Sequence, residues 1–427
     1  MLFRLLAWLI LPGLLLAEGP LTAEQRRSNS ESFEYVWKTI QDKHWDLKGL
    51  DWRAVHDELR PRIERAETME QARAVLSDMI ARLHQTHFGI IPSEVYQDVD
   101  SSAPAAGEGD VGLDVRVLDG LAVVTRLDPG SPAGAAGVKP GWVIARVNGE
   151  PLAPSIEKVA QAYRDSSLQE LMLTRSILNR LRGDRNGKIR VEFLDAGDRP
   201  VDLELERTPP RGKAAQFGFL PTQYVWFESR KIPPNTGYVR FNMFLDPPRL
   251  MTNFAESVES CMGCDGFVVD LRGNPGGIGL MAMGMAGWFI DQPGKRLGTM
   301  YMKDAKLNFV VNPRVKTFQG PVAILVDGAS GSTSEIFAGG MKDLRRARIF
   351  GTRTAAAALP SVIERLPNGD GFQYAMANYI SEGGKPLEGV GVMPDTEVRL
   401  TRGALIEGRD PVIEASIHWI EAQRKSP

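Results

Sequence analysis

This 427-residue sequence has few cysteines, little charge imbalance and few long apolar runs. The two cysteines, Cys261 and Cys264, form a CxxC at a predicted helix end, where a disulfide is compatible with the spacing. No metal-ligand partners accompany them, so no metal or redox site is expected. The 51 Lys and Arg residues against 53 Asp and Glu give no basic field, so nucleic-acid binding is not expected.

The first residues have the pattern of a secretory signal peptide. Arg4 precedes an apolar stretch, Pro12 interrupts it, and the small residue Ala17 stands before the polar Glu18. We therefore expect residues 1–17 to be removed and the product to be periplasmic or secreted; a retained N-terminal anchor is the alternative. No later segment is apolar enough to span a bilayer, so the mature chain is expected to have no membrane span.

Beyond the leader, the pattern predicts three domains. Residues 18–98 show helical spacing of apolar residues and predict an N-terminal helical domain. A linker rich in small residues follows, over residues 99–109. Residues 108–208 form the second domain and residues 215–427 the third, in which strands alternate with helices, as in a largely parallel sheet. The predicted fold class is a multidomain α/β protein.

The second domain carries a specific motif. Alternating strands at 111–117 and 121–127 precede Ser131-Pro-Ala-Gly-Ala-Ala-Gly-Val-Lys-Pro-Gly-Trp-Val-Ile-Ala-Arg-Val-Asn-Gly149. This run resembles a PDZ domain, with Trp142 where Asp is usual. In such a β-barrel domain a peptide adds as an extra strand and its end is held by backbone N–H groups. The resemblance places these groups at Val111, Gly112, Leu113 and Asp114.

A strand-to-helix turn at Ser332 is the first candidate for chemistry. The apolar strand 322–326 runs into Asp327-Gly-Ala-Ser-Gly-Ser-Thr-Ser-Glu335 and then into a predicted helix from Ser334 to about Leu344. Such a turn can present a hydroxyl beside free backbone N–H groups at the positive end of a helix. Ordinary helix capping by a serine produces the same pattern, so the turn alone leaves both interpretations open.

Two further motifs accompany this turn. The buried strand 267–270 leads into Leu271-Arg-Gly-Asn-Pro-Gly-Gly277, and a late segment has the sequence Pro386-Leu-Glu-Gly-Val-Gly-Val-Met-Pro-Asp395. Together with the PDZ-like run, in this order, these motifs resemble the tail-specific, or C-terminal-processing, serine peptidase family. The resemblance implies that Ser332 is the nucleophile, and that the amides of Thr333 and of Gly276 or Gly277 form the oxyanion hole.

One element of that family is missing. The lysine base of the processing peptidases falls on Ala357, within the run Ala355 to Ala358. A second branch, which resembles the tricorn core protease, uses a histidine from the N-terminal region and a late glutamate. Leu83-His-Gln-Thr-His-Phe-Gly-Ile90 is similar to that branch's segment and supplies His87 with Thr86 beside it, while Glu388 matches the glutamate. His87 would then be the base, with Glu388 or Thr86 holding its ring.

The sequence therefore predicts an exported serine endopeptidase of the Ser-His(-Glu) type. It is expected to act on protein or peptide substrates recognised through the PDZ domain, possibly by their C-terminal tails, and to need no cofactor and no metal. A catalytically inactive pseudo-peptidase that binds peptides is the alternative, because the lysine is replaced. A carrier of apolar ligands is a third alternative, since the resemblance extends to retinoid-binding repeats; the PDZ pattern argues against it.

Overall fold

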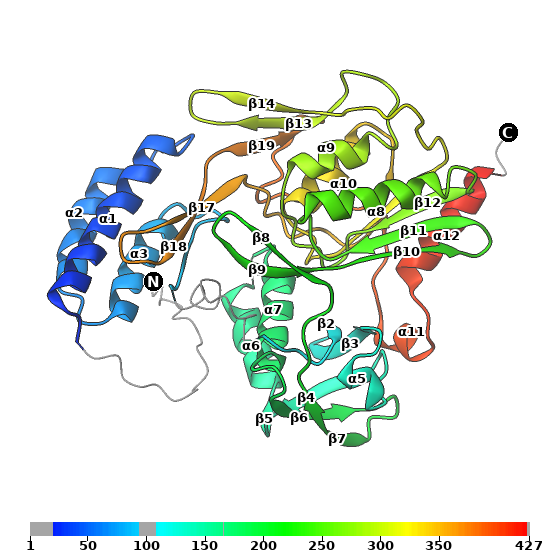
Figure 1. Cartoon of the computed structure of the whole chain (residues 1–427), viewed down its shortest axis with the longest axis horizontal. Helices are drawn as coiled ribbons and strands as arrows, with labels where there is room; N and C mark the ends of the chain where they lie inside the picture. The colour runs from blue at the N-terminus through cyan, green and yellow to red at the C-terminus, as the bar shows by residue number, and fades with distance from the viewer. Residues whose placement is uncertain (1–19, 94–107, 165, 425–427) are drawn as a thin grey trace.

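The computed structural model describes residues 20–93, 108–164 and 166–424, and Figure 1 shows how its helices and strands are arranged. The expected signal peptide and most of the expected linker lie outside these residues. Within them, no helix is long and apolar enough to cross a membrane.

Three helices open the chain: α1 (Ala23–Lys43), α2 (Trp52–Glu64) and α3 (Met69–Ala81). The hydroxyl of Thr22 accepts a hydrogen bond from the Gln25 amide, and the Gln25 side-chain oxygen accepts one from the Thr22 amide, so α1 begins in a capping box. The apolar faces of the three helices pack together around Phe33, Leu59 and Leu76.

A small sheet completes this helical region with strands from the other end of the chain. Strand β1 (Gly89–Ile91) pairs antiparallel with β18 (Gly371–Ala375), which pairs with β17 (Ser361–Arg365). Phe372 and Tyr374 are buried in the same core as the N-terminal helices. Residues 361–375 therefore share a core with the N-terminal helices.

The second region contains an antiparallel sheet with the order β2-β3-β4-β6-β7. Its strands are β2 (Leu113–Leu118), β3 (Leu121–Leu127), β4 (Val143–Val147), β6 (Lys188–Leu194) and β7 (Pro200–Glu206), with β5 (Glu150–Pro151) paired to β4. Its helices are α5 (Pro132–Ala135), α6 (Ala153–Ala162) and α7 (Gln169–Leu181). Helix α7 packs on β2 and buries Leu173 and Ile177 in the core of this region.

The third region is built on a six-stranded sheet with the order β10-β11-β12-β15-β16-β20. Its strands are β10 (Phe227–Ile232), β11 (Thr236–Phe241), β12 (Gly266–Asp270), β15 (Val322–Val326), β16 (Arg348–Gly351) and β20 (Thr396–Glu397). All neighbours from β11 to β20 are parallel, and β10 is antiparallel to β11. A hairpin of β8 (Lys213–Phe217) and β9 (Leu220–Val225) precedes this sheet.

Helices cover both faces of this sheet. Helices α8 (Pro247–Glu259), α9 (Leu280–Ala286) and α10 (Thr333–Asp343) contribute to the large core on one face, while α12 (Pro411–Arg424) packs on the other. A three-stranded sheet, β14 (Lys306–Val310), β13 (Arg296–Tyr301) and β19 (Asn378–Ser381), lies against α10, and α11 (Arg402–Ile406) precedes α12. Met281 and Met285 of α9 are buried in this core.

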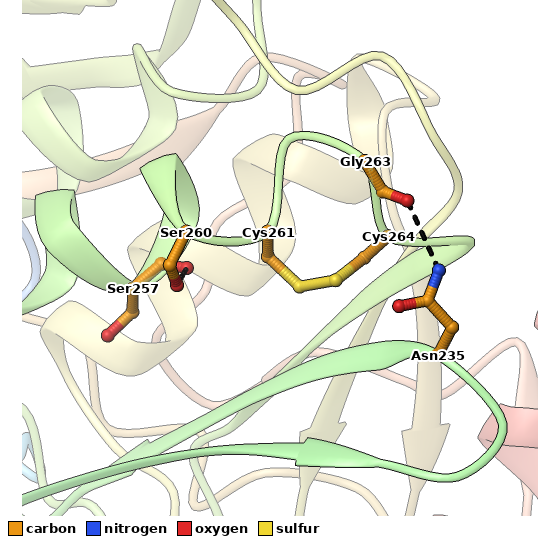
Figure 2. Close-up of a disulfide and its surroundings, with 6 residues drawn as sticks. All are labelled: Asn235, Ser257, Ser260, Cys261, Gly263 and Cys264. Atoms are coloured by element: carbon orange, nitrogen blue, oxygen red, sulfur yellow. Dashed lines mark hydrogen bonds between the residues drawn. A yellow bond between two sulfur atoms is a disulfide. The ribbon is translucent and has the colours of Figure 1, made fainter.

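The two cysteines form a disulfide in the turn after α8, as Figure 2 shows. The side-chain amide of Asn235 donates a hydrogen bond of 3.1 Å to the Gly263 carbonyl and ties this turn to the start of β11. A Cβ at Gly237 would lie 2.6 Å from the Cys261 sulfur, so only glycine lets β11 approach the disulfide this closely.

Candidate functional site

Two turns meet at one edge of the parallel sheet, because β12 and β15 are adjacent and both run toward that edge. The first turn follows β12 and contains Asn274; the second follows β15 and contains Ser332. Asn274 joins them, since its carbonyl accepts hydrogen bonds from the Gly331 amide (3.0 Å) and the Ser334 hydroxyl (2.9 Å). The fully buried Asn274 side chain donates to the Phe241 carbonyl, which fixes the turn to β11.

Ser332 stands at the start of α10 in a backbone conformation that is rare for a residue with a side chain. Its φ of 52° and ψ of −116° are held by two hydrogen bonds from its amide, to the Ala357 carbonyl (2.7 Å) and to Glu335 Oε2 (2.9 Å). Strain of this kind persists where the surrounding structure enforces it, and it is typical of a nucleophile on a sharp strand-to-helix turn. The Glu335 amide also donates to the Ser332 carbonyl (2.8 Å).

The backbone amides around Ser332 form a small space without side chains. A Cβ on Gly276 would lie 2.6 Å from the Ser332 Cβ and 2.7 Å from the Thr333 nitrogen, so glycine keeps this space open. The Gly276 amide itself donates to Asn274 Oδ1 (2.9 Å). Among the described residues, the amides of Thr333 and Gly277 have no hydrogen-bond acceptor, and the Thr333 hydroxyl donates to the Gly277 carbonyl (2.7 Å).

His87 is linked to Glu388 through the hydroxyl of Thr86. Thr86 Oγ1 donates to Glu388 Oε2 (3.0 Å) and lies 2.7 Å from His87 Nδ1. The Thr86 amide also donates to Glu388 Oε1 (3.0 Å), so the carboxylate holds both the backbone and the side chain of Thr86. Since a hydroxyl has a single proton and donates it in the hydrogen bond to Glu388, Thr86 Oγ1 accepts a hydrogen bond from the N–H at His87 Nδ1. The other ring nitrogen, Nε2, is then left as a proton acceptor.

Burial sets the protonation of this group. It lowers the pKa of His87 from 6.5 to about 4, with a smaller contribution from the positive charge of Arg175, so the imidazole is neutral at pH 7. Burial also raises the pKa of Glu388, while the hydrogen bonds from Thr86 and from the Ala358 amide oppose this shift. A neutral imidazole is the form that can accept a proton.

The alanine run at the position of the missing lysine connects the two halves of the site. Its backbone contacts Ser332 through the Ala357 carbonyl and Glu388 through the Ala358 amide, at 2.7 and 3.1 Å. A continuous path of hydrogen bonds and adjacent residues therefore runs from Ser332 through this run, Glu388 and Thr86 to His87. No direct hydrogen bond joins His87 to Ser332 in the part of the chain that the structure describes.

Glu335 binds the backbone of this alanine run. From the sequence it was not identified as a site residue. It is fully buried and accepts hydrogen bonds from the Thr354 hydroxyl (2.6 Å) and from the amides of Ala356 (2.8 Å), Ala357 (3.0 Å) and Ser332. Burial raises the pKa of Glu335 to about 7, and the four donors oppose this rise. An acidic residue three positions after the turn serine is the only sequence signal for this role.

Two other ionisable residues are exposed. They are His84, on the same segment as His87, and Lys385, in its turn. Lys342 pairs with Asp395 at 3.0 Å. No group of three or more metal-ligating side chains occurs within residues 20–93, 108–164 and 166–424.

The four residues expected to capture a peptide end lie at the start of β2. Val111 and Leu113 are buried, the Gly112 amide donates to Asp110 Oδ1 (2.9 Å), and Asp114 pairs with Arg116 at 2.8 Å. All four line a cavity of 820 Å³ that also reaches the two turns of the third region at Pro275 and Ala329. The loop therefore shares one cavity with Pro275 and Ala329 of these two turns.

Comparison with known proteins finds two family matches and several relatives. Residues 235–398 match peptidase family S41, and residues 25–81 match the tricorn protease C1 domain. The carboxy-terminal processing protease CtpA of Bacillus subtilis (strain 168) is 23% identical over 326 residues, which cover 76% of this chain and 63% of that protein. The carboxyl-terminal-processing protease of Synechocystis sp. (strain ATCC 27184 / PCC 6803 / Kazusa) is 25% identical over 368 residues, covering 85% and 77%.

Solved structures show the same fold. The photosystem II D1 C-terminal processing protease superposes with a TM-score of 0.56 at 21% identity, covering 89% of this chain and 94% of that chain. The tricorn protease superposes with a TM-score of 0.51 at 16% identity, covering 94% of this chain and 37% of that chain. By these domains the chain falls among the serine-type peptidases, a class of hydrolases. It carries a peptidase family S41 domain together with a tricorn-type N-terminal segment.

Proposed function

We propose that this chain is an active serine endopeptidase with a Ser-His-Glu mechanism. Ser332 Oγ attacks the scissile carbonyl carbon while His87 Nε2 takes its proton. The same proton then goes to the leaving amine, and water releases the acyl group from Ser332 by the reverse sequence. The observation that carries the proposal is the hydrogen bond between Thr86 Oγ1 and His87 Nδ1, because it fixes the tautomer that a base requires.

The negative charge of the tetrahedral intermediate would lie against the amides of Thr333 and Gly277. Both amides lack an acceptor within the described ranges, whereas the Gly276 amide is occupied by Asn274. Gly276 is assigned a different task, which is to leave room for the substrate carbonyl beside Ser332. Two donors in a water-poor turn stabilise an oxyanion by several kcal/mol; loss of one typically costs about 3–4 kcal/mol.

Substrate recognition is assigned to the second region as a PDZ domain over residues 108–208. A polypeptide tail would be held at the loop Val111–Asp114 and would extend through the shared cavity toward Ser332. The names of the relatives, which are processing proteases, support a protein substrate. We assign the activity to the periplasm or the cell exterior, on the basis of the N-terminal leader.

Labelling by a fluorophosphonate probe tests the mechanism, because the probe reacts with an activated serine. We expect the folded wild-type chain to be labelled and to degrade casein, and Ser332→Ala to do neither. His87→Asn should lose labelling, while His84→Asn should keep it. These two variants are matched, since both histidines have a positive φ, which asparagine tolerates. Absence of labelling in the wild type, or labelling that persists in Ser332→Ala, would reject the mechanism.

A peptide-binding scaffold without catalysis is the second candidate, and Ala357 at the lysine position is the observation that favours it. It predicts that tail peptides bind in calorimetry with equal affinity to the wild type and to His87→Asn. Neither form would be labelled or degrade casein. The two candidates therefore separate in the same set of variants.

A further inference from the structure

His44, which caps the C-terminal end of α1, contacts the segment that carries the proposed base. Its side chain is buried, and its ring nitrogen Nε2 lies 2.9 Å from Gln85 Oε1. The same ring stacks on Phe88, with the two ring centroids 6.0 Å apart. In the sequence, Gln85 and Phe88 directly flank Thr86 and His87. His44 therefore contacts both ends of the short segment that presents the imidazole.

This segment, between α3 and β1, depends on such contacts because regular structure does not hold it. His84 and His87 have positive φ angles of 51° and 61°, which residues with a side chain rarely adopt. Among the residues that the structure describes, residues 85–87 make no backbone–backbone hydrogen bond. Side chains set the position of the segment instead, through contacts with Glu388 and with His44.

The partners of His44 also fix the proton on its ring. The Asp46 amide donates a hydrogen bond of 3.0 Å to Nδ1, so Nδ1 carries no proton and Nε2 carries one. Nε2 therefore donates to Gln85 Oε1, and burial lowers the pKa of His44, so the ring is neutral at pH 7. The ring also stacks on Trp45 at a centroid distance of 4.2 Å. Gln85 thus meets a donor whose orientation and tautomer are both fixed.

The end of α1 is attached in turn to the part of the fold that carries Ser332. Lys303 lies between β13 and β14, and its Nζ donates to the carbonyls of Gln41 and Asp42, both at 3.1 Å. These carbonyls belong to the last turn of α1, where a cation is favourable. Strand β13 packs on α10, which begins directly after Ser332, and Figure 1 shows the β13–β14 hairpin extending from there toward α1. Base and nucleophile are therefore connected through α1 as well as through Glu388.

We propose that His44 is a positioning residue for catalysis, which fixes the place of the His87 imidazole relative to Ser332. It acts through Gln85 and Phe88 and not on the substrate. A displacement of a reacting group by about 1 Å can lower a rate by about 100-fold, so a contact of this kind has a measurable effect on turnover. This inference rests on the proposed Ser-His-Glu mechanism and identifies a further residue that the mechanism requires.

The test measures kcat and KM for fluorescently labelled casein, using the full chain and its variants. His44→Phe keeps an aromatic ring but loses both hydrogen bonds, and we expect it to lower kcat by about 10- to 100-fold with KM within about two-fold of the wild type. His44→Gln can still donate to Gln85 and should recover kcat to within about five-fold of the wild type. Gln85→Leu removes the same hydrogen bond from its other side. It should also lower kcat, and the double variant with His44→Phe should lose little more.

A second readout is the dependence of fluorophosphonate labelling on pH. If the His87 imidazole is displaced in His44→Phe, it becomes more hydrated, and the midpoint of labelling should rise toward 6.5. His56→Phe is the matched control, because His56 lies in the same helical region and its ring also packs against two aromatic rings, those of Phe33 and Trp37. This control should keep both the kcat and the midpoint of the wild type, and circular dichroism verifies that each variant is folded.

The outcomes separate this inference from the mechanism. If the wild type is labelled, but folded His44→Phe and Gln85→Leu retain its kcat and midpoint, the positioning role is wrong and the mechanism stands. A loss of kcat that His56→Phe shares would also overturn the role, since it would be a general effect on the helical region. If the wild type is not labelled, hydrogen exchange of the amides of residues 85–88 decides by mass spectrometry. Exchange about 10-fold or more faster in His44→Phe than in His56→Phe supports the role, and equal exchange refutes it.

Discussion

The hydroxyl of Thr86 is the smallest group whose removal should disable the site. Thr86→Val keeps the β-branched shape of the side chain but leaves His87 Nδ1 and one oxygen of Glu388 without their shared partner. A hydrogen bond to a charged group contributes about 1.5–3 kcal/mol and one between neutral groups about 0.5–1.5 kcal/mol. The combined loss, about 2–4 kcal/mol, corresponds to a reduction of kcat of about 30- to 1000-fold, since the ring is no longer held in one tautomer.

Thr86→Ser is the matched control, because serine supplies the same hydroxyl without the methyl group. The assay is the second-order rate constant of fluorophosphonate labelling, together with casein turnover and circular dichroism to verify folding. We expect Thr86→Ser to remain within a few-fold of the wild type and Thr86→Val to fall into the range above. If Thr86→Val reacts within three-fold of the wild type, by the same measure that shows His87→Asn to be inactive, then Thr86 does not orient the ring.

Three further predictions follow from burial and backbone geometry. The rate of labelling by a neutral probe should decline on acidification, with a midpoint at a pH well below 6.5. The reason is that the pKa of His87 is about 4 and that the neutral imidazole is the reactive form. A midpoint at or above pH 6.5 would contradict this. Gly276→Ala should reduce the rate of labelling by about 100-fold or more, since the new Cβ would meet the Thr333 nitrogen. Gly403→Ala is the control and should leave the rate unchanged, because no atom lies within 4 Å of its Cβ. The Glu335 carboxyl has a folded pKa of about 7, so between pH 4.5 and 7 it keeps its proton in the folded chain while the unfolded chain releases it. The free energy of unfolding should therefore fall by about 3 kcal/mol as the pH rises over that range. Urea denaturation of Glu335→Gln should lack this pH dependence, and a slope that is the same as in the wild type would refute the assignment.

The sequence predicted the turn at Ser332 because its signals are local. An apolar strand, a run of small residues and a helix succeed one another within about twenty positions, and β12, β15 and α10 are confirmed close to their expected bounds. The pairing of β17 and β18 with β1 could not be predicted in this way. It joins residues 361–375 to residues 89–91, and no local pattern encodes contacts between segments so far apart.

For the candidate site, too, the sequence predicted some features and not others. Motif resemblance named His87, Glu388 and Ser332, but it could not show that Thr86 stands between the histidine and the glutamate. It also identified the alanine run only as the absence of a lysine, whereas the backbone of that run contacts both Ser332 and Glu388. Backbone contacts do not depend on the side chain, so a sequence of alanines gives no sign of them.

The most direct test of the central claim is a crystal structure of the chain after reaction with a fluorophosphonate. The account predicts phosphorus bonded to Ser332 Oγ, one phosphoryl oxygen within hydrogen-bond distance of the Thr333 and Gly277 amides, and His87 Nε2 about 3 Å from Ser332 Oγ. A phosphonylated Ser332 whose oxygen is far from His87, with the imidazole held elsewhere by Thr86, would contradict it.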